Sequence, residues 1–161
     1  IFGTKERSLI KLANKEGIKA VVAQQFELAK QVSAAGLVPI VEPEVDIHSP
    51  EKEAAEVILK EELAKHLAEL EPHVKVILKL SIPTIDNFYE SLSEDSHVVR
   101  VVALSGGYSR EEANARLSRN HHLIASFSRA LSEGLAYQQS PEEFNKTLEN
   151  SVSTIYEASI A

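Results

Sequence analysis

The sequence of 161 residues contains no cysteine, no methionine and no tryptophan. Without cysteine there can be no disulfide, no thiolate metal ligand and no cysteine nucleophile, and nothing points to an oxidising compartment. We therefore expect a cytoplasmic protein. Because the chain begins at Ile1 and lacks methionine, we also expect a fragment of a longer polypeptide.

Positive charge and long apolar runs are scarce as well. Lys and Arg number 17 against 24 Asp and Glu, which gives a net charge of -7. A chain of this charge lacks the basic surface that nucleic acid or an anionic membrane requires. No apolar stretch approaches the roughly 20 residues of a membrane helix, and no signal-peptide pattern is present. We expect neither nucleic acid nor a membrane as a partner.

Short, continuous apolar runs recur along the chain. They cover Leu37–Val41, Val74–Leu80, Val98–Leu104 and, more weakly, Leu123–Phe127. Strands lose their polar alternation when both faces are buried, as in a parallel sheet covered by helices. The runs therefore predict buried parallel strands.

Helix signals separate these runs. Ile18–Ala35 has apolar residues at helical spacing, and Gly36 follows where a helix C-cap belongs. Ser49-Pro50, Ser109 and Ser140-Pro141 each precede acidic residues, a pattern typical of helix starts. The alternation of strand and helix predicts a single α/β domain without a linker.

Reactive side chains are placed at the carboxyl ends of the predicted strands. Glu42 closes the first predicted strand, Lys79 the second and Ser105 the third, and Arg129 lies just past the fourth. An open doubly wound sheet and a (β/α)8 TIM barrel both fit the alternation, but barrel enzymes build their active sites at this end. We therefore predict a barrel.

Lys79 is the most informative of these residues. It lies in a strongly apolar strand, where a buried ammonium must either be paired or lose its proton and become a nucleophilic amine. Side chains two residues apart share a strand face. Glu42 and Glu44 therefore lie on one face of their strand, and Lys5 and Arg7 lie on one face of theirs if the opening segment is extended. The expected inward set is two lysines, an arginine and glutamates, and a neutral amine among them could form a Schiff base with a carbonyl compound.

A phosphate site is expected next to this set. Ser105-Gly106-Gly107 can present backbone N–H groups to an anion ahead of a helix. Arg129, at the next strand end, can fork onto a phosphate. Barrels often hold phosphate at their last two strands, so we predict a phosphorylated substrate.

Five segments together resemble class I fructose-bisphosphate aldolases, especially the short bacterial form. These segments occur in the family's order and at comparable spacing: Phe2–Ser8, Pro39–Glu44, Leu78–Lys79, Leu104–Gly107 and Ser126–Leu131. The resemblance spans nearly the whole chain. It implies a lyase of glycolysis and the carboxyl-terminal part of one barrel domain over residues 1–161, an incomplete barrel from about the fourth to the eighth βα unit.

The resemblance also implies roles. Lys79 matches the lysine that forms the Schiff base with the ketose phosphate, and Glu42 the carboxylate that moves protons during its formation and breakdown. Glu44 matches a second acid, Lys5 a lysine near the cleaved bond, and Arg7 a basic residue facing the distal phosphate. The implied substrate is fructose 1,6-bisphosphate, and neither a metal nor another cofactor is needed.

The phosphate clamp on the dihydroxyacetone side is matched by Ser105, Gly106 and Arg129. Ser128 departs from the glycine of many family members, but a serine keeps the backbone N–H that the clamp uses. The family's aspartate and a further lysine lie on earlier strands that this chain lacks. The activity of the 161-residue chain alone therefore stays open.

Two other interpretations remain. One is a transaldolase or another lysine-dependent sugar-phosphate aldolase, which would share the Schiff base but not this set of motifs. The other is a non-catalytic fragment, because an incomplete barrel leaves two unpaired strand edges. Self-association, or pairing with the missing amino-terminal segment, would cover those edges. The six histidines, including His121 and His122, lack metal-site spacing and are expected to be structural or exposed.

Overall fold

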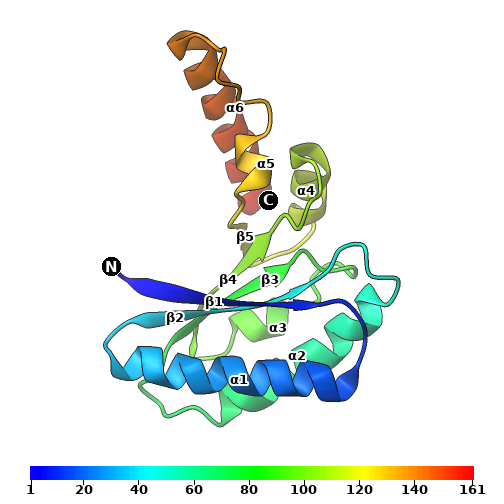
Figure 1. The fold of residues 1–161 in the computed structure, drawn as a ribbon, viewed down its shortest axis with the longest axis vertical. Coiled ribbons are helices and arrows are strands. Elements are labelled where there is room, and N and C mark those ends of the chain that lie inside the picture. Colours follow the sequence, from blue (N-terminus) through cyan, green and yellow to red (C-terminus); the bar gives the residue numbers. More distant parts are fainter.

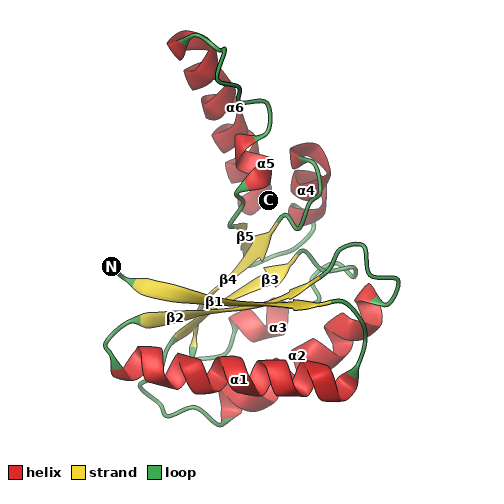
Figure 2. Cartoon of the chain, in the orientation of Figure 1, coloured by secondary structure: helices red, strands yellow, loops and turns green.

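The computed structural model describes all 161 residues. Five parallel strands form one sheet whose spatial order follows the chain (Figure 2). The strands are β1 (Gly3–Ile10), β2 (Val38–Val45), β3 (Val76–Ser81), β4 (Val98–Leu104) and β5 (Leu123–Ala125). The predicted α/β class and parallel sheet are confirmed.

Six helices connect the strands or follow the last of them. They are α1 (Lys15–Ala34), α2 (Lys52–Ala68), α3 (Glu90–Ser93), α4 (Arg110–Leu117), α5 (Arg129–Ser132) and α6 (Pro141–Ser159). Figure 1 shows α1, α2 and α3 on the same side of the sheet, while α6 extends away from it beyond β5. Right-handed crossovers between neighbouring parallel strands place successive helices on one side. None of the helices combines the length and the apolar character needed to cross a bilayer.

The core lies between the sheet and α1 and α2. Val41 and Leu78 point from β2 and β3 toward the helices and are fully buried with Phe26 of α1 and Leu59 and Leu63 of α2. Burying one such side chain contributes about 1.5–3 kcal/mol. These contacts fix the strands, so the other face of the sheet is free to carry polar groups.

Two predicted helix starts are confirmed and one is wrong. The Ser109 and Ser140 side chains accept hydrogen bonds from the third residue of α4 and of α6. The helix expected at Ser49 instead begins at Lys52. The Ser49 hydroxyl donates to the carbonyl of Lys11, at 2.8 Å, and so ties two loops together.

Helix α1 begins earlier than its apolar pattern indicates. The Asn14 side chain accepts from the Gly17 N–H at 2.7 Å, and this cap starts the helix at Lys15 rather than Ile18. At its other end Gly36, with φ of 79°, follows the C-cap residue Ala35. A left-handed glycine just after a helix is the usual termination.

Strand β2 is longer than its apolar run. The prediction that Glu42 ends the strand is wrong, because β2 continues to Val45 and contains Glu42 and Glu44. Pairing with β1 explains the extension, since the register continues through Leu9 opposite Glu44 to Ile10 opposite Val45. Backbone pairing thus places two carboxylates inside the sheet.

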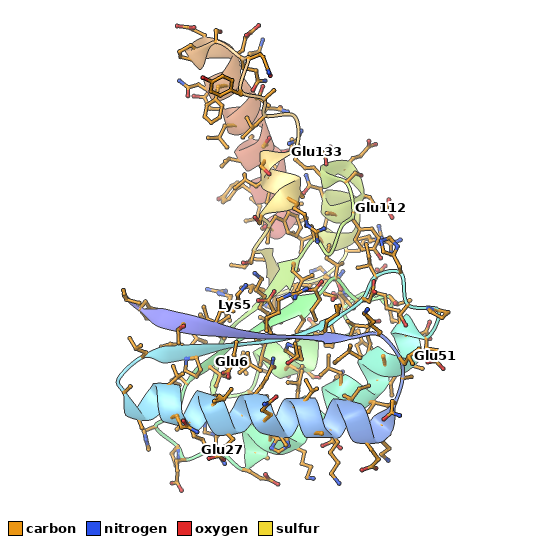
Figure 3. All side chains as sticks on the ribbon, in the orientation of Figure 1. Lys5, Glu6, Glu27, Glu51, Glu112 and Glu133 are labelled. Carbon is orange, nitrogen blue, oxygen red and sulfur yellow. The ribbon has the colours of Figure 1, made fainter.

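Glu6 lies on the helix-covered face of β1, whereas Lys5 lies on the opposite face (Figure 3). Both carboxylate oxygens of Glu6 are shielded from solvent and lack a hydrogen-bond partner. The nearby Gln25 amide donates to the Glu6 carbonyl and to the Ser8 hydroxyl instead. Burial raises the pKa of Glu6 from 4.5 to about 7.

Glu6 should make the stability of the chain fall between about pH 4.5 and 7. An acid whose pKa is raised on folding binds its proton more tightly in the native state, so its stabilising contribution is complete below the unfolded pKa and is lost as pH rises through the folded pKa. We expect Glu6→Gln, which cannot ionise, to remove this decline in urea unfolding. The exposed Glu27→Gln should retain it, and a parallel decline in both variants would contradict the assignment to Glu6.

Candidate active site

A polar pocket of about 180 Å³ lies on the helix-free face, near the carboxyl ends of the strands. It brings together nine of the ten predicted site residues, and Gly107 lies outside its lining. Ser126 and Leu104 complete it. The lining residues are Lys5, Arg7, Glu42, Glu44, Lys79, Leu104, Ser105, Gly106, Ser126, Ser128 and Arg129.

Glu42 is the buried anion at the centre of the pocket. Its side chain is 4% exposed, and its two oxygens contact two different lysines: Oε1 lies 3.5 Å from Nζ of Lys79, and Oε2 lies 3.0 Å from Nζ of Lys5. The Lys5 contact is an ion pair that is not aligned as a hydrogen bond, so Oε2 keeps a free acceptor position. A buried carboxylate is tolerated when cations pair with it.

Lys79 is more accessible than its apolar strand predicts. Its side chain is 16% exposed, because β3 directs Lys79 to the helix-free face while Leu78 and Leu80 point into the core. Its Nζ makes no hydrogen bond and has only the 3.5 Å contact with Glu42. The amine can therefore be approached from the pocket.

Arg7 and Glu44 form the third ion pair of the site. The Arg7 Nε donates to Glu44 Oε2 at 2.7 Å. This hydrogen bond and the charge of Glu44 raise the pKa of Arg7, so the guanidinium remains a cation. Only Nε is used, and the outer N–H groups of this half-exposed side chain stay available to an anion.

The glycine loop after β4 has a backbone that only glycine adopts easily. Gly106 has φ of 65° and Gly107 φ of 120°. A Cβ at Gly106 would lie 2.5 Å from Cγ2 of Ile47, and one at Gly107 would lie 3.8 Å from Nη1 of Arg129. The loop is thus packed against the segment after β2 on one side and faces Arg129 on the other.

Ser126, missed as a site residue, comes directly after the short strand β5. Its N–H donates to the Ala103 carbonyl at 2.7 Å, which extends the pairing with β4 beyond Ala125. Ser128 and Arg129 follow at the start of α5 and are exposed. One feature of the sequence could have indicated Ser126 as a site residue. It lies two residues before Ser128, at the end of the same strand.

The histidines lie away from this pocket. His66 stacks on Phe26 with ring centroids 5.2 Å apart, and His97 Nδ1 lies 2.9 Å from the Val74 carbonyl oxygen. His121 and His122 are exposed. No three His, Asp or Glu side chains gather as a group that could hold a metal ion.

The sheet order, the one-sided helices and the polar groups at the strand ends make the chain an incomplete TIM barrel. Comparison with solved structures agrees: a fructose-bisphosphate aldolase from Plasmodium falciparum, in complex with TRAP and a small-molecule inhibitor, matches with a TM-score of 0.70 and 25% sequence identity. The match covers 98% of this chain and 55% of that one.

Sequence comparison defines the family. The chain is similar to proteins named fructose-bisphosphate aldolase class 1: it is 66% identical to one from Clostridium acetobutylicum, 61% to one from Synechocystis sp. and 59% to one from Porphyromonas gingivalis. Each match covers 99% of this chain and 53–54% of the relative. The chain belongs to the class I fructose-bisphosphate aldolases and spans about half the length of these curated relatives. No protein-family model matches it.

Alanine at Gly106 should destabilise the chain more than alanine at Gly36. Both glycines have positive φ, so each substitution costs about 1–2 kcal/mol of backbone strain. Only Gly106 also has a neighbour in the way, at 2.5 Å, and overpacking adds about 1–3 kcal/mol. Urea unfolding of both variants measures the difference, and equal losses would contradict the packing of the loop against Ile47.

Proposed function

We propose that the protein from which this chain derives cleaves fructose 1,6-bisphosphate reversibly into dihydroxyacetone phosphate and glyceraldehyde 3-phosphate through a Schiff base on Lys79. The observation that carries the proposal is the buried Glu42 carboxylate, which lies within 3.5 Å of the accessible amine of Lys79. The name shared by the relatives supports the same reaction.

The chemistry follows from this pair. Lys79 gives up a proton, Glu42 accepts it, and the neutral amine attacks the C2 carbonyl. A second proton then passes from the attacking nitrogen to the C2 oxygen, which becomes a hydroxyl. Glu42 then returns a proton to the C2 hydroxyl, which leaves as water and gives a protonated imine. The imine takes up the electron pair of the C3–C4 bond, while the C4 hydroxyl loses its proton as the aldehyde departs. Protonation at C3 and hydrolysis release dihydroxyacetone phosphate and restore the amine.

Lys5 and Glu44 have supporting roles in this proposal. Lys5 adds a positive charge beside Glu42 and near the bond that breaks, while Glu44 holds Arg7 in position. We assign the base for the C4 hydroxyl to strands outside these 161 residues, as the family resemblance implies. Complete turnover therefore requires the rest of the barrel.

Two cationic groups would hold the two phosphates. Arg129, with the N–H groups of Gly106 and Ser128 and the hydroxyl of Ser105, would bind the phosphate next to C2, and Gly107 gives this loop its shape. Arg7 would bind the distal phosphate. Arginine suits this task because its guanidinium can donate two parallel hydrogen bonds to a phosphate.

The test traps the imine. We would build a full-length chimera in which this chain replaces the matching 160-residue segment of the Clostridium acetobutylicum relative. With dihydroxyacetone phosphate and borohydride, the reduced imine should be found on Lys79 by mass spectrometry, and Glu42→Gln should slow its formation by about 10²–10⁴-fold, the usual contribution of a general acid–base group.

Lys75→Met is the control for the loss of a lysine, and it should leave formation of the Lys79 adduct unchanged. Lys75 belongs to the same segment but is exposed and bonds only the Ser96 carbonyl. An adduct on another lysine, or none in the chimera, would overturn the proposal. An imine trapped from fructose 1-phosphate, which lacks the distal phosphate, as fast as from fructose 1,6-bisphosphate would favour a different sugar-phosphate aldolase. Faster trapping from fructose 6-phosphate, which lacks the phosphate next to C2, would favour a transaldolase.

We also propose that the 161 residues are the carboxyl-terminal part of a single barrel domain and pair with the segment that completes it. An apolar groove of about 420 Å³ lies along the open edge of β5, between that strand and α6. Val152 and Tyr156 of α6 line it and are more than half exposed. An unpaired strand edge beside an apolar groove is suited to a further strand and helix.

Mixing separate polypeptides tests this pairing. The half of the Clostridium acetobutylicum relative outside the match should form a one-to-one complex with this chain in sedimentation experiments. Val152→Asp with Tyr156→Asp should weaken the complex, whereas Val57→Asp on the outer face of α2 should not. Self-association of this chain without any complex would contradict the pairing and favour a homo-oligomer.

A further inference from the structure

The ladder between the strands that carry Glu42 and Lys79 is short and ends next to these two residues. The register of β1 with β2 continues to Val45, and that of β3 with β4 continues to Ser81. The pairing of β2 with β3, by contrast, covers only two positions and ends at Val41 opposite Leu78. Backbone pairing between these two strands therefore ends one residue before Glu42 and Lys79.

Side chains bridge the two strand ends beyond this point. The Ser81 hydroxyl donates to the Val45 carbonyl at 2.6 Å, directly from the end of β3 to the end of β2. Lys52, in the first turn of α2, donates to the carbonyl of Ile82 at 2.8 Å and to the hydroxyl of Thr84 at 3.1 Å. The bridge thus holds the segment that immediately follows β3, three residues beyond Lys79.

Glu56 completes the bridge from one turn further along α2. Its Oε1 accepts the third hydrogen bond of the Lys52 ammonium, and its Oε2 accepts the Thr84 N–H at 3.0 Å. The side chains of Lys52 and Glu56 are only 9% and 2% exposed. Burial lowers the pKa of Lys52, which the neighbouring charge of Glu56 opposes. All three donors of its ammonium are used on fixed acceptors outside the pocket, so Lys52 is no second Schiff-base lysine.

A buried ion pair of this kind does little for stability by itself. Removing two charges from water costs about as much as their attraction returns, and apolar replacements are often neutral or stabilising. A role in geometry would account for its place, because each of its outer hydrogen bonds ends on the loop after β3.

We infer that Lys52, Glu56 and Ser81 form a clamp that sets the position of Lys79 relative to Glu42. All three are then positioning residues for the Schiff-base step. This inference rests on the proposed function. The clamp contacts neither the pocket nor the substrate, so it acts through the backbone of β3. The phosphate-binding groups Gly106, Ser128 and Arg129 lie on other strand ends and share no hydrogen bond with it.

The test removes the Lys52–Glu56 part of the clamp without leaving a buried charge. In the full-length chimera, Lys52→Met with Glu56→Leu replaces both charged groups by apolar ones of similar length. Lys52→Met alone leaves Glu56 buried without its cation, so this single variant is expected to unfold more easily. The double variant should stay folded, lower kcat and the rate of borohydride-trapped imine formation about tenfold, and leave KM within twofold. Lys75→Met serves again as the control lysine.

Hydrogen exchange supplies a readout that needs no activity. The amides of Ile82–Phe88 should exchange at least tenfold faster in the double variant, and those of β4 should not change. Unchanged exchange in this loop, or a folded double variant with full kcat, would overturn the clamp. If the unmodified chimera forms no imine at all, the proposed function fails, and the exchange result alone decides whether the clamp holds the loop.

Discussion

The rest of the structure depends on one constraint: parallel strands that follow one another in the sheet must have all their crossover helices on the same side. Helices α1, α2 and α3 obey it and bury one face of the sheet in the apolar core. The other face is left without a helix and is therefore the place where strand residues can be polar. Lys5, Arg7, Glu42, Glu44 and Lys79 all use this face.

Two lysine–glutamate pairs on this scaffold have opposite designs. Lys52 uses every donor on fixed acceptors beside Glu56 and is shut away from solvent, so its charge can only hold neighbouring groups in place. Lys79 has one long contact with Glu42 and opens onto the pocket. The free coordination of Lys79 is what a nucleophile requires, and the full coordination of Lys52 excludes that chemistry. The surroundings of an amine, more than its burial, decide its role.

The sequence predicted the α/β class and nearly all of the pocket lining, because apolar runs mark the strands and side-chain parity assigns their faces. It failed where tertiary pairing overrides local pattern. Pairing with β1 carries β2 past Glu42, and the Ser49 hydroxyl bonds the Lys11 carbonyl rather than capping a helix at Pro50. The hydrogen bonds of Lys52 were equally unpredictable from the sequence, since a lysine in the first turn of an amphipathic helix is ordinarily exposed. Only the folded chain brings Ile82 and Thr84 to it.

A crystal structure of the full-length chimera with dihydroxyacetone phosphate tests the central claim most directly, namely that Lys79 is the covalent nucleophile of this site. The account predicts a continuous bond from Lys79 Nζ to C2 of the ligand, the Glu42 carboxylate beside that carbon, and the phosphate against Gly106 and Arg129. A covalent bond to Lys5 or Lys52, or a ligand bound without any bond to Lys79 when the crystals are catalytically active, would contradict it.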